Sequence, residues 1–117
     1  MPIHPLLPRP EETVMVEIKK ILLAYDGSEA ADKAYRHALD LAGKYGADLR
    51  VLAVASPPEF AEDVETEAIL ENAQEHYEQQ FVALKEQVAA QEVQPRFEVA
   101  VGHPAEQIIY HAEQDEV

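Results

Sequence analysis

The residues best placed for chemistry are Asp26, Gly27 and Ser28, which directly follow an apolar run at 21–25. A run of this length is typical of a buried strand, and a small polar triplet after it is typical of a tight turn. Asp26 would then lie at the carboxyl end of a strand, the edge where open α/β sheets bind ligands. The alternative is an ordinary turn aspartate that accepts hydrogen bonds from local amides.

The remaining reactive side chains form no recognisable catalytic or metal site. Ser28 lacks a G-x-S-x-G elbow and a paired base, so it is interpreted as a helix N-cap and not as a nucleophile. The chain has no cysteine, which excludes disulfides, thiol catalysis and thiolate metal sites. The histidines show no metal-ligand spacing: His4, His37, His76, His103 and His111. We therefore expect no catalytic residue, no metal and no enzymatic activity.

Three of these histidines are expected in solvent, and one is expected close to the candidate site. His37 and His76 fall on the polar sides of predicted helices, and His111 is expected at the surface. His103 falls at a strand-to-helix turn near the edge that would bind a ligand.

The net charge of the chain limits the kinds of partner that it can bind. The 117 residues suit a single domain, and 9 basic against 23 acidic side chains give a formal charge of -14. Such a chain repels phosphate backbones and anionic lipid, so neither nucleic acid nor a membrane is an expected partner. A nucleotide is still compatible, because backbone amides and helix N-termini can hold phosphates. With no long apolar run and no signal peptide, we expect a cytoplasmic protein.

The hydrophobic pattern predicts alternating strands and helices. The run at 21–25 precedes a helix that Ser28 caps and Gly46 ends in a left-handed turn. Further elements are predicted at these ranges: strand 48–55, loop 59–64, helix 65–91, edge strand 96–101 and helix 104–114. This βαβαβα order indicates an α/β fold with a parallel sheet and right-handed crossovers.

Two of the predicted helices carry apolar faces at helical spacing. Tyr77 and Phe81 are interpreted as core residues of the longer helix and not as a stacking platform. In the last helix, the expected apolar face is formed by Ala105, Ile108, Ile109 and Ala112.

The first 16 residues are predicted to be a disordered, proline-rich tail, which leaves a folded domain at 17–117. Met15 directly precedes the first strand, so the natural start is either Met15 or Met1 with a genuine flexible tail.

The sequence KKILLAYDGS at 19–28 resembles the opening strand and turn of the universal stress protein family. The similarity continues through VLAV at 51–54 and through VGHPA at 101–105 with Ile108, so that it spans about 17–117. The resemblance implies a doubly wound, Rossmann-like parallel sheet of the adenine-nucleotide alpha-hydrolase-like kind. Its five strands would have the order 3-2-1-4-5, and members are usually dimeric.

The same resemblance implies a nucleotide site for ATP or AMP, with Mg²⁺ as an optional companion. If the family's site is carried over to this sequence, Asp26 would hydrogen-bond the ribose or adenine, and Ala24 and Tyr25 would line the pocket at the strand end. Backbone groups of Val54 would meet the adenine edge, and Gly102 would keep the third turn tight near the site.

The sequence departs from the family where the phosphates would bind. The family's loop after strand four reads G-x2-G-x9-G-[ST], and the only pair here with its first spacing is Gly43 and Gly46. Ser56 stands where the third glycine would be, and the pair precedes a strand instead of following one. The phosphate half of the site and the last two strands are thus expected to be missing. We expect a chain that is part of a longer protein, or one that is unstable or associates as a homodimer or other oligomer through an exposed strand edge.

Two functions remain open, and a third is disfavoured. The first is a nucleotide-responsive stress protein that binds ATP or AMP without catalysis. The second is a structural or interaction module of the same family that binds no nucleotide. A PP-loop ATP pyrophosphatase would need an SGGxDS loop, whereas this chain has only YDGSE at 25–29.

Overall fold

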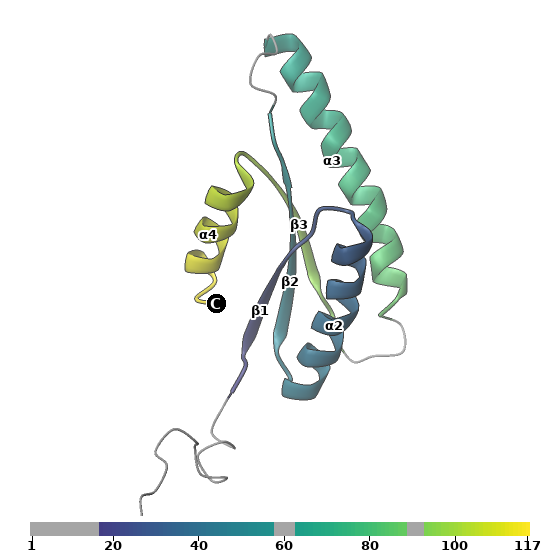
Figure 1. The fold of residues 1–117 in the computed structure, drawn as a ribbon, viewed down its shortest axis with the longest axis vertical. Helices are drawn as coiled ribbons and strands as arrows, with labels where there is room; N and C mark the ends of the chain where they lie inside the picture. The colour runs from purple at the N-terminus through teal and green to yellow at the C-terminus, as the bar shows by residue number, and fades with distance from the viewer. Residues whose placement is uncertain (1–16, 58–62, 89–92) are drawn as a thin grey trace, which may run out of the picture.

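A computed structural model describes residues 17–57, 63–88 and 93–117 of the chain (Figure 1). The elements follow in this order: β1 (Lys20–Ala24), α2 (Glu29–Tyr45), β2 (Asp48–Ala55), α3 (Asp63–Glu86), β3 (Arg96–Val101) and α4 (Pro104–Gln114). The predicted α/β class and element order are confirmed. The helix expected at 65–91 begins at Asp63, inside the loop expected at 59–64, and it ends at Glu86, with residues 87 and 88 in a turn. The predicted tail at 1–16 and the rest of that loop lie outside the described residues.

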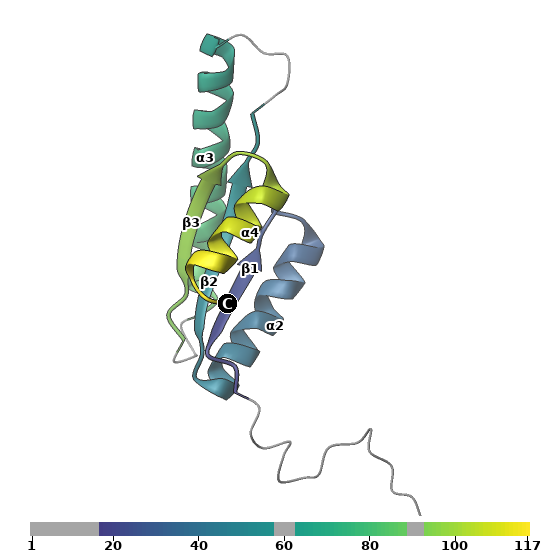
Figure 2. The ribbon, with the colours of Figure 1, turned by 90° about the vertical axis from the view of Figure 1, so that its left-hand side faces the viewer.

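The three strands form one parallel sheet in the order β1-β2-β3. β2 is central, so its main chain pairs on both sides, with Leu23 opposite Val51 and Val51 opposite Phe97. Helices α2 and α3 cover one face of the sheet, and α4 covers the other (Figures 1 and 2). β3 is the partly exposed edge strand that its alternating sequence predicted.

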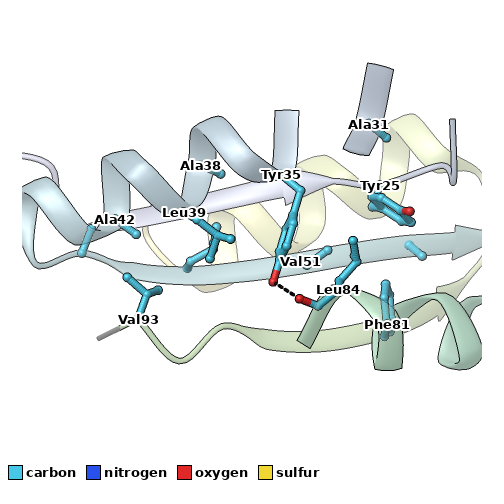
Figure 3. Close-up of a cluster of buried hydrophobic side chains, with 13 residues drawn as sticks. Tyr25, Ala31, Tyr35, Ala38, Leu39, Ala42, Val51, Phe81, Leu84 and Val93 are labelled. Carbon is cyan, nitrogen blue, oxygen red and sulfur yellow. Dashed lines mark hydrogen bonds between the residues drawn. The ribbon is translucent and has the colours of Figure 1, made fainter. Parts of the chain in front are cut away.

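The main hydrophobic core lies between the sheet and the helices α2 and α3 (Figure 3). Tyr35 of α2 is fully buried there, and its hydroxyl donates a 3.0 Å hydrogen bond to the carbonyl oxygen of Leu84 in α3. Burial raises the pKa of Tyr35 to about 12, because the charged phenolate would lose its hydration. Phe81 is also buried, which confirms it as a core residue.

Both predicted signals at the ends of α2 are confirmed. The Ser28 hydroxyl accepts a 3.1 Å hydrogen bond from the amide of Ala31, as an N-cap does. Gly46 has a φ of 64°, which is the left-handed conformation in which helices commonly stop. The helix therefore starts directly after the turn that follows β1.

The sheet-facing side of α4 differs from the apolar face that its sequence predicted. Ile109 is 59% exposed and Ala105 is exposed, whereas His111, expected at the surface, is only 9% exposed. The reason is a charged cluster on this face of the sheet. Arg50 of β2 forms ion pairs with Glu98 of β3 and with Asp115, which directly follows α4.

His111 belongs to the same cluster, because its Nδ1 lies 3.6 Å from Glu98 Oε2. The cluster joins the two strands to the end of α4, so Arg50 fixes where the helix lies on the sheet.

We predict that Arg50→Met lowers the free energy of unfolding by roughly 1–3 kcal/mol, because it leaves two half-buried carboxylates without their cation. Urea denaturation measures this loss. Arg96→Met is the matched control, since Arg96 is exposed on the neighbouring strand. Equal stability of the two variants would contradict a structural role for the cluster.

One edge of β1 has no strand beside it among the described residues. The amide of Tyr25 donates to Leu52, and the carbonyl of Lys19 accepts from Asp48, so the odd-numbered residues of β1 pair with β2. The main-chain groups of Leu22 and Ala24 therefore face the open edge. An unpaired edge with half-buried apolar side chains is a template for pairing with another chain.

We predict that the chain self-associates through this edge, and that added salt strengthens the association by screening the charge of -14. Sedimentation velocity over a range of concentrations measures it. Leu22→Pro should favour the monomer, because proline removes only an outward-facing amide at this position. Ile21→Pro is the control and should unfold the domain, since it removes a bond to β2. A monodisperse, cooperatively unfolding wild-type monomer would disprove the prediction.

Candidate functional site

A hollow of about 610 Å³ lies at the carboxyl ends of β1 and β2. The turn after β1 forms one side of it, with Asp26 and Ser28 in the lining. Pro104 and Ile108 of α4 contribute another part of the wall, and Tyr77 of α3 also reaches the hollow. Its volume is within the range of about 300–1,000 Å³ that is usual for small-molecule sites.

Four of the five residues predicted to meet a nucleotide line this hollow, namely Ala24, Tyr25, Asp26 and Val54. Gly102 does not line it. Its φ of 145° and its 3.0 Å amide hydrogen bond to the carbonyl of Ala55 instead shape the turn between β3 and α4. Gly102 therefore affects the hollow indirectly, through the turn that presents the start of α4.

Asp26 is exposed, and its carboxylate is held by Ser28. Its Oδ1 accepts a 3.0 Å hydrogen bond from the Ser28 amide and a 2.6 Å hydrogen bond from the Ser28 hydroxyl. The hydroxyl bond first, and the amide bond second, lower the pKa of Asp26 below its ordinary value. Both bonds from Ser28 go to Oδ1, and neither uses Oδ2.

Tyr25 is a wall of the hollow, and its hydroxyl is already engaged. The side chain is 5% exposed, and its hydroxyl donates a 2.6 Å hydrogen bond to Asp32 Oδ1 in α2. Burial raises the pKa of Tyr25, and the hydrogen bond to Asp32 adds to the effect. The ring also packs against Phe81, with the ring centroids 6.1 Å apart. Tyr25 can therefore offer a ligand its apolar surface but not a free hydroxyl.

Small and apolar side chains form most of the remaining surface. On α2 the hollow is lined by three alanines, Ala30, Ala31 and Ala34, whose short side chains leave room beside the helix. Leu52 and Val54 of β2 lie in the same lining. Asp26 is the only charged residue in the described lining, and no lysine or arginine lies there. Such a surface suits a flat, uncharged group that carries hydroxyls to hydrogen-bond.

Sequence reasoning missed several members of this lining. Ser56 and Pro104 carried no role in a site, although their places after strands β2 and β3 could have suggested one. Tyr77 was assigned to the core, and it is half-buried there while also lining the hollow. His103 is exposed at the start of α4 and lies outside the lining.

Two further histidines are exposed, and the described residues contain no cluster of metal ligands. His37 and His76 are exposed, as predicted. Within residues 17–57, 63–88 and 93–117, no group of three or more potential ligands could hold a metal ion. No helix in these ranges is both long enough and apolar enough to cross a membrane.

A second hollow, of about 560 Å³, lies at the opposite edge of the sheet beside Gly43 and Gly46. The sequence predicted that this glycine pair would precede a strand, which is the wrong end of the sheet for binding phosphate. Helix α2 ends here, and the end of a helix carries partial negative charge, which disfavours anions. Strand carboxyl ends and helix N-termini meet at the first hollow, so we take that one as the candidate site.

Comparison with known proteins shows the family to which the chain belongs. The model of the universal stress protein family matches residues 17–117. The chain belongs to the universal stress protein family. A comparison with curated protein sequences finds no significant match.

Solved structures of universal stress proteins share the fold. The universal stress protein UspA from Lactobacillus plantarum aligns with a TM-score of 0.79 and 22% identity, over 86% of this chain and 72% of that one. Hypothetical protein MJ0577, solved as a test case of structural genomics, aligns with a TM-score of 0.76 and 24% identity, over 87% of this chain and 71% of that one. A protein of the universal stress protein family from Burkholderia pseudomallei aligns with a TM-score of 0.64 and 21% identity, over 85% of this chain and 76% of that one.

We predict that the two hydrogen bonds from Ser28 make folding depend on the ionisation of Asp26. Because the folded-state pKa of Asp26 is lowered, this stabilisation is present above the unfolded pKa of about 3.9. It is lost as the pH falls through the lower folded value. Ser28→Ala should raise the pKa of Asp26 towards its ordinary value and cost about 1 kcal/mol of stability through the lost N-cap.

NMR titration of the Asp26 carboxyl carbon measures this pKa. Ser56→Ala is the control, because Ser56 lines the same hollow but has no contact with Asp26 that would hold the carboxylate. An unchanged Asp26 pKa in Ser28→Ala would show that the Ser28 hydroxyl does not hold the carboxylate, since the amide of residue 28 is present in both proteins.

Proposed function

We propose that this universal stress protein domain binds the nucleoside part of an adenine nucleotide, ATP or AMP, without catalysing a reaction. The observation that carries the proposal is the hollow at the carboxyl edge, where Ala24, Asp26 and Val54 come together from two strands. Its walls are apolar except for one carboxylate and a few hydroxyls, and these are the groups that an adenine ring and a ribose would meet.

Each part of the hollow's lining would contact a different part of the nucleoside. A ribose hydroxyl would donate to the Asp26 carboxylate, because an ionised carboxylate is an acceptor only. The lowered pKa of Asp26 keeps it ionised at neutral pH, which strengthens that hydrogen bond. The adenine ring would occupy the slot between the α2 alanines and the side chains of Leu52 and Ile108. Main-chain groups at Val54 would then meet the edge of the base.

The charge of the lining limits what the phosphates can add. No cation lies in the described lining, and the nearby Glu29 and Asp32 are acidic. The first amides of α2 can attract an anion, but this effect is small at an exposed site. We therefore assign most of the affinity in this chain to the nucleoside. The ligand would act by stabilising the folded domain, as any molecule that binds only the native state does.

The alternative is an interaction module of the same family that binds no nucleotide. It is favoured by the Asp26 geometry itself, because Ser28 already supplies two donors to Oδ1, as in an ordinary turn aspartate. In that case Asp26 would serve only to form the turn and to start α2.

We predict that adenosine, AMP and ATP bind with similar dissociation constants, and that Asp26→Asn weakens all three by roughly tenfold or more through loss of a charge-assisted hydrogen bond. Isothermal titration calorimetry measures the affinities. Asp40→Asn is the control, since Asp40 is exposed on α2 and outside the hollow.

Equal binding by wild type and Asp26→Asn would remove Asp26 from the site. No binding of any of the three ligands by the wild type would favour the interaction module. Much tighter binding of ATP than of adenosine would show that phosphate contacts dominate, against the charge argument.

A further inference from the structure

One turn of helix α3 lies beside the end of β1 and the turn that carries Asp26. Tyr77 lines the hollow, and Phe81 packs against Tyr25. Between them along the helix, Gln80 lies against Gly27, in the middle of the β1–α2 turn. The segment from Asp26 to Ser28 is thus backed by α3, which comes from a distant part of the chain.

The contact between Gln80 and Gly27 is close. A β-carbon built on Gly27 would lie 2.8 Å from Gln80 Oε1 and 2.9 Å from Gln80 Nε2. Real β-carbons do not approach other atoms so closely, so the side-chain amide of Gln80 rests where any other residue at position 27 would place its side chain. Gly27 also has a φ of 82°, which favours glycine independently.

The environment of Gln80 is unusual for a residue that only stabilises the fold. Its Oε1 is buried and has no hydrogen-bond partner among the described residues. A buried carbonyl without a partner is destabilising, so an apolar side chain of the same length would be at least as stable here. Gln80 therefore acts on the turn through the volume of its side chain and not through a hydrogen bond to Oε1.

We propose that Gln80 is a positioning residue for the nucleoside site: by packing on Gly27 it fixes the turn that aims the Asp26 carboxylate into the hollow. This inference rests on the proposed function and adds helix α3 to the site. A turn fixed in advance loses less conformational freedom when ligand binds, which improves affinity.

The test compares three substitutions in the full chain. Gln80→Ala removes the packing, and Gln80→Met keeps the volume without the amide. Gln79→Ala is the matched control, because Gln79 is exposed on the same helix. Two quantities are measured in each: the pKa of the Asp26 carboxyl by NMR without ligand, and the dissociation constant for adenosine. With only four glycines in the chain, the Gly27 amide signal can be assigned readily and reports the turn directly.

We expect Gln80→Ala to shift the Gly27 signal, to raise the Asp26 pKa towards its ordinary value, and to weaken adenosine binding by roughly two- to tenfold. Gln80→Met should restore all three towards wild type, and Gln79→Ala should change none. An unchanged Asp26 pKa and unchanged affinity in Gln80→Ala would overturn the inference. So would a Gln80→Met variant that is as impaired as Gln80→Ala.

A second measurement needs no ligand and separates this inference from the proposed function. Gly27→Ala should shift the side-chain amide signals of Gln80 in the NMR spectrum, because the added β-carbon would lie within 3 Å of both Oε1 and Nε2 and would displace that amide. Unchanged Gln80 amide signals would overturn the contact. If wild-type protein binds no adenosine, the proposed function fails, and this measurement together with the Asp26 pKa still decides whether Gln80 positions the turn.

Discussion

The two hydrogen bonds from Ser28 to Asp26 Oδ1 determine how the first strand passes into the first helix. Ser28 has a double role, because its hydroxyl donates to Asp26 and also accepts from the amide of Ala31. The same few atoms therefore close the turn, start α2 and orient the carboxylate. Gly27 makes this possible with a positive φ and with no side chain to displace Gln80.

A consequence of this turn is a site with one charge and few polar groups. The chain as a whole is strongly acidic, yet the described lining of the hollow contains a single acidic residue and no basic one. Alanines on the facing helix leave the space, and Tyr25 forms a rigid wall because its hydroxyl is tied to Asp32. Shape and one acceptor thus define the ligand. A nucleoside, as proposed above, would be held there by the fit of its base and by the hydroxyls of its sugar.

Local patterns were sufficient to predict most of the fold. The strand 48–55 and the helix signals at Ser28, Gly46 and Pro104 depend on residues close together in the sequence, and the structure confirms them. Position at a strand end was enough to predict Asp26 at this hollow, whereas Ala24 and Val54 were predicted from the family resemblance. These features follow from backbone geometry, which short-range sequence controls.

Features that depend on distant residues could not be predicted in this way. The ion pairs of Arg50 with Glu98 and Asp115 join α4 to the sheet. The apolar pattern within the helix was right for Ile108 and Ala112, which are half-buried, and wrong for Ile109, which is exposed. The hydroxyl of Tyr25 meets Asp32 only after α2 has formed, and Gln80 reaches Gly27 from a different helix. Each of these contacts joins elements whose relative positions a single sequence pattern does not contain.

The most direct test of this account is a crystal structure of the chain grown with adenosine. The account predicts density for the nucleoside in the hollow at the carboxyl ends of β1 and β2, with a ribose hydroxyl within hydrogen-bond distance of Asp26. Adenosine bound elsewhere, for example in the hollow beside Gly43 and Gly46, would contradict it. So would adenosine in the predicted hollow with the Asp26 carboxylate turned away from the ribose.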